Sequence, residues 1–177
     1  MFPLHWILAA VTLAANNSPA AGQIGAYYFE TAGSSQVWIR LEPQGLERGP
    51  NPMLLTVTAS FPSRRLEREP DTVELRVQSI GGTFPNRIRQ RAFSLVMDNA
   101  TGLDLAVPAH SFQFVSTCSE CPLDTVIARV PFGVLRDMSV SRTVTINALG
   151  FAGRLDAADL EALGKYVAAL RGGVVIH

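Results

Sequence analysis

The sequence contains few of the residues on which most enzyme chemistry depends. Its 177 residues include three histidines, and two of them, His5 and His177, lie at the ends of the sequence. A nucleophile paired with an imidazole base would have to use His110, which follows a proline-containing turn. The sequence also lacks a Gly-x-Ser-x-Gly elbow, a glycine loop for phosphate and a dinucleotide-binding fingerprint. We therefore expect no catalytic residue, no cofactor and a protein that is not an enzyme.

Net charge is lacking as well. The sequence has 15 Lys and Arg residues against 15 Asp and Glu residues, which gives a formal net charge of zero. A balanced chain has no overall field that would attract nucleic acid or an anionic membrane surface. We expect no nucleic-acid partner.

Long apolar runs are missing. The apolar stretch at the N-terminus, Trp6–Ala15, has 10 residues, which is too short to span a bilayer but suits the core of a signal peptide. Ser18 and Ala20 are the small residues expected before a cleavage site. We predict a signal peptide at residues 1–21, with a mature chain that has no transmembrane span and lies in the periplasm or outside the cell. A first strand or an uncleaved anchor is the alternative interpretation of this stretch.

Short alternating segments fill most of the remaining chain. Apolar residues alternate with Trp38 and Arg40 in one segment and with Glu74 and Arg76 in another, as in strands with one buried face. Strands are predicted at residues 23–30, 36–42, 53–60, 72–80, 92–98, 102–107, 111–116, 125–130 and 142–149. Residues 22–177 are therefore predicted to form a single β-rich domain, a β-sandwich of roughly 8–10 short antiparallel strands with one C-terminal helix.

The strongest helix signal lies near the end of the sequence, over residues 156–171. Asp156 is a suitable N-cap, and Asp159 follows three residues later as a variant of the capping box. Leu163, Val167 and Leu170 form an apolar stripe with Leu160. We expect this helix to cover part of the core. Between the strands, residues 131–138 predict one short helical turn and residues 42–52 a loop, and Gly150 is expected to begin a turn that leads into Phe151–Leu155.

The two cysteines, Cys118 and Cys121, are separated by two residues in a segment between predicted strands. Glu120 and Asp124 would raise the pKa of a thiol and slow its attack, so we predict a structural disulfide at a hairpin tip. A redox-active pair is the alternative. A zinc site needs about four ligands, and His110 is the one internal histidine available. We expect no metal site.

An arginine cluster is the remaining candidate for binding. Arg87, Arg89 and Arg91 would share one face of an extended segment and form a possible surface for an anion or a partner. A solvated edge strand, in which charges block pairing between sheets, is the alternative.

These observations predict an exported, non-catalytic β-sandwich domain with a binding or structural role. Its partner would be an unidentified protein or another component of the cell envelope. Two alternatives stay open: a periplasmic thiol–disulfide redox protein that uses Cys118 and Cys121, and a subunit of a cell-envelope assembly.

Overall fold

The computed structural model describes residues 21–45, 53–80, 93–98, 104–106, 112–116, 123–148 and 151–176. In this part of the chain, a large antiparallel sheet has the strand order β1-β2-β4-β5-β9-β8 and a small antiparallel sheet has the order β3-β11-β10-β6-β7. The large sheet consists of Ile24–Phe29 (β1), Ser34–Leu41 (β2), Met53–Phe61 (β4), Thr72–Ile80 (β5), Leu123–Pro131 (β9) and Phe112–Ser116 (β8). The small sheet consists of Gln44–Gly45 (β3), Phe151–Leu155 (β11), Val144–Ala148 (β10), Phe93–Met97 (β6) and Asp104–Ala106 (β7).

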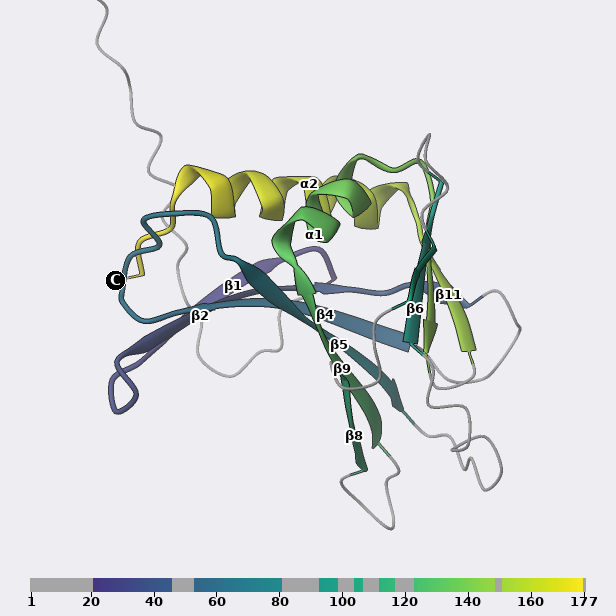
Figure 1. Cartoon of the computed structure of the whole chain (residues 1–177), viewed down its shortest axis with the longest axis horizontal. Coiled ribbons are helices and arrows are strands. Elements are labelled where there is room, and N and C mark those ends of the chain that lie inside the picture. The colour runs from purple at the N-terminus through teal and green to yellow at the C-terminus, as the bar shows by residue number, and fades with distance from the viewer. Residues whose placement is uncertain are drawn as a thin grey trace, which may run out of the picture.

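Two helices lie against the same face of the large sheet (Figure 1). The first, Phe132–Val140 (α1), contacts β5 and β9, and the second, Ala157–Gly172 (α2), contacts β2 and also β11 of the small sheet. Because α2 contacts strands of both sheets, it connects them across a common core. We call the helix-covered side of the large sheet its inner face and the opposite side its outer face.

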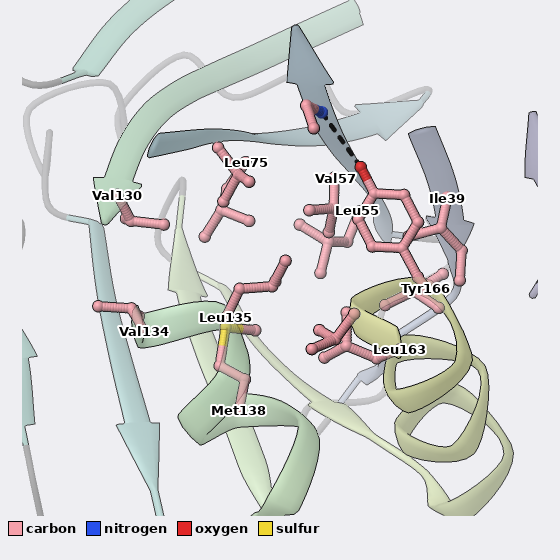
Figure 2. Packing of buried hydrophobic residues seen from close by; sticks show 14 of the residues in the cluster. Ile39, Leu55, Val57, Leu75, Val130, Val134, Leu135, Met138, Leu163 and Tyr166 are labelled. Carbon is pink, nitrogen blue, oxygen red and sulfur yellow. Dashed lines mark hydrogen bonds between the residues drawn. The ribbon is translucent and has the colours of Figure 1, made fainter. Parts of the chain in front are cut away.

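The inner face supplies the core, because the strands of the large sheet alternate between buried and more exposed residues. In β2, Val37, Ile39 and Leu41 are fully buried, and the residues between them are half-buried. One buried cluster joins these residues to the helices and to the small sheet, through residues such as Leu135 and Ile146. Figure 2 shows part of this cluster between the sheet and the two helices.

Tyr166 of α2 is the polar residue at the centre of this core. Its side chain is fully buried, and its hydroxyl donates to the carbonyl of Val37 at 2.7 Å and accepts from the amide of Ala59 at 3.1 Å. Val37 and Ala59 face each other across β2 and β4, so the hydroxyl bridges a residue pair within the sheet. Figure 2 shows the hydroxyl of Tyr166 pointing from the helix toward the sheet. Desolvation raises the pKa of this phenol far above its ordinary value, which keeps it protonated as a donor.

The C-terminal helix begins as predicted. The carboxylate of Asp156 accepts a hydrogen bond from the Asp159 amide at 2.8 Å, so Asp156 is the N-cap. The predicted capping box is completed differently, because the carboxylate of Asp159 accepts from the amide of Glu42 at 3.3 Å. This bond ties the start of α2 to the end of β2.

The described residues confirm a mainly β fold with two antiparallel sheets and a C-terminal helix. The sequence interpretation was wrong in two places. Gln44–Gly45 form the short strand β3 within the predicted loop, and the expected helical turn is the nine-residue helix α1. Residues 151–155, which follow the predicted turn at Gly150, form strand β11. Pairing of β11 with β10 and β3 supplies backbone hydrogen bonds that local propensity does not reveal. In α1, burial of Phe132, Leu135 and Met138 overrides the weak helix propensity of its glycine, serine and valines.

Candidate functional site

The outer face of the large sheet presents aromatic and arginine side chains at positions that the core does not use. Strand pairing aligns these positions in rows, because residues directly opposite in antiparallel strands share a face. One row runs from Gly25 through Trp38 and Thr58 to Glu74 and Arg129. The next row runs from Arg40 through Thr56 and Arg76 to Ile127. We define Trp38, Arg40, Arg76 and Arg129 as the outer-face surface.

The indole of Trp38 lies over Gly25 of the neighbouring strand. A Cβ atom added to Gly25 of β1 would lie only 2.5 Å from Cε2 and Cζ2 of the Trp38 indole. The indole therefore occupies the space above Gly25, and a side chain at that position would push it away. Glycine in a strand interior often marks such a close approach. The pair gives the outer face a broad aromatic ring held close to the backbone.

Arg40 is two residues from Trp38 on the same strand face. Its side chain is 28% exposed, and its Nη2 lies 4.0 Å from a carboxylate oxygen of Glu42. Its Nε is buried and has no hydrogen-bond partner among the residues that the structure describes. An unsatisfied buried donor costs roughly 1–3 kcal/mol.

Arg76 and Arg129 extend the surface across β5 and β9. Arg76 donates to Glu74 of its own strand at 2.9 Å, and Glu74 faces Arg129 across the strand pair. Three arginines thus share this face with Glu74 and, at the end of β2, Glu42. The surface is mildly basic, and a carboxylate lies beside two of its guanidinium groups, Glu42 beside Arg40 and Glu74 beside Arg76.

The area of this face fits a protein partner. Strands β1, β2, β4, β5 and β9 at about 4.8 Å spacing, with up to nine residues each, give roughly 20 by 30 Å. One partner contributes about 800 Å² to an interface of standard size. Interfaces are enriched in tryptophan and arginine and depleted in lysine, and the single lysine of this sequence, Lys165, lies on α2.

A second unusual group lies at the start of α2. Asp159 is buried, and its Oδ2 has no hydrogen-bond partner in the described structure. Desolvation, together with repulsion from Asp156 and Glu42, raises the pKa of this carboxyl above its ordinary value of 3.8. The helix N-terminus and the Glu42 amide oppose this shift. The carboxylate closes the junction between β2 and α2, and we assign it a structural role.

The residues that the sequence singled out lie outside the described part of the chain. They are Cys118, Cys121, Arg87, Arg89, Arg91 and His110. Within the described residues, no group of three or more His, Cys, Asp and Glu side chains is placed to hold a metal ion. No helix in this part is long and apolar enough to cross a membrane.

Part of the outer-face surface could be predicted from the sequence. Alternation had already turned Trp38, Arg40 and Arg76 away from the core, and the structure confirms these orientations. The sequence pattern could not show that these three side chains lie together, because their proximity depends on the register of strands that are far apart in the chain. Arg129 carried no separate signal.

Comparisons with known proteins assign no family. No protein-family model matches the chain, and neither a curated protein nor a solved structure matches it. The site therefore has to be interpreted from its own chemistry.

Proposed function

We propose that this protein is an exported, non-catalytic binding module that recognises a protein partner through the outer-face surface. The observation that carries the proposal is the arrangement of Trp38 and Arg40, a broad aromatic ring beside a guanidinium on the same strand face, with Arg76 in the same row as Arg40. Tryptophan and arginine are the residues on which binding energy concentrates in protein interfaces.

The inner face already supplies the core, which supports a binding role for the outer one. Val37, Ile39 and Leu41 of β2 pack inward beneath the helices. Trp38 and Arg40 alternate with them and contribute to a separate surface. A polar outer face would keep the sheet just as soluble, so an indole and arginines there are better explained by recognition than by folding.

Export is part of the proposal. The short apolar run Trp6–Ala15, followed by small residues before Ala21, supports a signal peptide. The periplasm or the extracellular space would also permit a disulfide between Cys118 and Cys121. The partner would then be another protein of the cell envelope or its surroundings.

A photo-reactive amino acid at Thr56 tests the proposal, because Thr56 lies between Arg40 and Arg76 on the outer face. In the cells that make the protein, we expect one discrete protein adduct. Combining Arg40→Ala with Arg76→Ala should reduce its yield by at least about tenfold, as expected for two hot-spot residues.

Two controls make this result interpretable. The same probe at Val140, which is 80% exposed on α1, should give no such adduct. The pair Arg136→Ala and Arg171→Ala removes two exposed arginines that instead approach Glu69, and it should leave the yield unchanged. The proposal is wrong if Thr56 gives no adduct or if the arginine pair on the outer face does not affect it.

A further inference from the structure

Strand β1 is an edge strand without the usual protection against pairing. In the described part of the chain it pairs with β2 alone. Its residues Ile24–Phe29 include no charged residue and no proline, whereas natural edges are normally blocked by charges, proline, bulges or short length. The edges of the small sheet, β3 and β7, have two and three residues, so they are protected by their shortness. β1 has six.

Among the described residues, the exposed aromatic side chains lie on this edge. Tyr27 is 49% exposed and Phe29 is 38% exposed on the outer face, and their rings meet edge to face with centroids 4.6 Å apart. A segment that combines aromatic side chains, no charge and free backbone groups is a strong template for another strand. An edge of this kind is expected to be covered by a partner strand in the native protein.

A second copy of the same strand fits this edge. In antiparallel pairing about a two-fold axis through Tyr27, each Tyr27 faces its own symmetry mate. Gly25 then faces Phe29 of the other copy, and Ala26 faces Tyr28, so Phe29 and Tyr28 each lie opposite a small residue. Because Trp38 covers Gly25, Phe29 of the other copy would arrive beside the indole.

Charge also permits self-association. The formal net charge of the chain is zero, so two copies do not repel each other over long distances. At the end of β1, Glu30 lies 3.6 Å from Arg64, whose guanidinium also stacks over Tyr28 with 4.3 Å to the ring centroid. This local pairing leaves no uncompensated carboxylate at the edge.

We infer that the protein forms a symmetric dimer in which β1 pairs antiparallel with β1 of a second copy. The two large sheets become one continuous sheet, with both outer faces on the same side. This inference uses the edge of the sheet and does not depend on the partner proposed for the outer-face surface.

Sedimentation of the purified protein over a range of concentrations tests the dimer. Wild type should sediment with twice the mass of one chain. Tyr27→Lys places two like charges directly opposite each other and should weaken self-association by at least about tenfold. Val140→Lys adds the same charge at an exposed position on α1 and should leave the dimer intact. A wild type that stays monomeric, or a Tyr27→Lys variant that dimerises as tightly, would overturn the inference.

Crosslinking tests the register and does not depend on the behaviour of the lysine variant. In a Cys118→Ser and Cys121→Ser background, Tyr27→Cys should be joined to its symmetry mate by a short thiol crosslinker. Phe29→Cys lies on the same strand face, but its two copies would be about 13 Å apart along the strands and should not be joined. Efficient crosslinking at Phe29→Cys without crosslinking at Tyr27→Cys would contradict the proposed pairing.

The two proposals fail separately. A monomer that still gives the Thr56 adduct would remove the dimer and keep the outer-face partner. A dimer that gives no Thr56 adduct would keep the dimer and remove the outer-face partner.

Discussion

At the scale of single residues, Tyr166 connects the helix layer to the sheet through one hydroxyl group. The hydroxyl donates to Val37 and accepts from Ala59, and both bonds lie in the dry core. Neither backbone group has access to water there, so the cost of losing the hydroxyl falls on two buried backbone groups at once.

Tyr166→Phe keeps the ring and removes those two hydrogen bonds. We expect the free energy of unfolding to fall by about 1–3 kcal/mol, because an amide and a carbonyl are left without partners. Urea denaturation followed by circular dichroism measures the change. Tyr27→Phe is the matched control: its side chain is half exposed, and it should change stability by less than about 0.5 kcal/mol. Equal effects of the two substitutions would disprove the role of the bridge.

Asp159 gives the fold a pH dependence of known sign. Burial raises the pKa of its carboxyl in the folded protein above 3.8, so the folded state binds a proton at a higher pH than the unfolded chain does. Its contribution to stability is therefore greatest at low pH and is lost as the pH rises through the folded-state pKa.

Comparison with Asp159→Asn isolates this effect. As the pH falls from about 7 toward about 4, wild type should gain stability relative to the variant, because only wild type takes up the proton. Above the folded-state pKa the difference between the two proteins should be constant. Urea unfolding at a series of pH values measures it. A wild type that instead gains relative stability as the pH rises would show that the pKa is lowered.

At the scale of elements, α2 is fixed at both ends by contacts that local sequence only partly specifies. Asp156 caps its start. After its end, the backbone of Leu66 donates to Val174 and that of Ile176 donates to Arg64, each at 2.8 Å. Gly173 joins these parts with φ of +83°, and a Cβ there would lie 3.1 Å from the carbonyl oxygen of Leu66. This glycine is needed for the turn, whereas Gly164 inside the helix has nothing within 4 Å of an added Cβ.

The two glycines should therefore respond oppositely to alanine. Gly164→Ala should raise the free energy of unfolding by about 0.5–1 kcal/mol, because alanine restricts the unfolded chain and favours the helix. Gly173→Ala should lower it by about 1 kcal/mol or more, because of the positive φ and the close carbonyl. Thermal unfolding of both variants beside wild type measures the pair. Stabilisation by both substitutions would contradict the strain assigned to Gly173.

At the scale of the whole molecule, one core joins two sheets and two helices, and among the described residues it uses neither the outer face of the large sheet nor the outer edge of β1. The residues directly after the predicted signal peptide already contact both layers. The Gly22 amide donates to the carbonyl of Arg40 at 2.7 Å, and Gly22 lies near Ala162 of α2.

Mass spectrometry of the protein from its native envelope fraction tests export and the cysteine pair together. We expect a chain that begins at Ala21 or Gly22, with both Cys118 and Cys121 blocked against alkylation under denaturing conditions. A structural disulfide should also have a reduction potential below about −300 mV. An intact Met1 with two free thiols would contradict the export proposal, and a much higher potential would favour the redox alternative.

The sequence by itself determined the features that depend on neighbours along the chain. Alternation located most strands and turned Val37 inward and Arg40 outward, and Asp156 marked the start of the last helix. These signals are local because a strand has a period of two residues and a cap acts over three. The tertiary structure alone decided that Tyr166 bridges β2 and β4, that Trp38 covers Gly25, and that β11 pairs with β10 and β3. Each depends on a register between segments that lie far apart in the sequence, and that register is set by packing of the whole core.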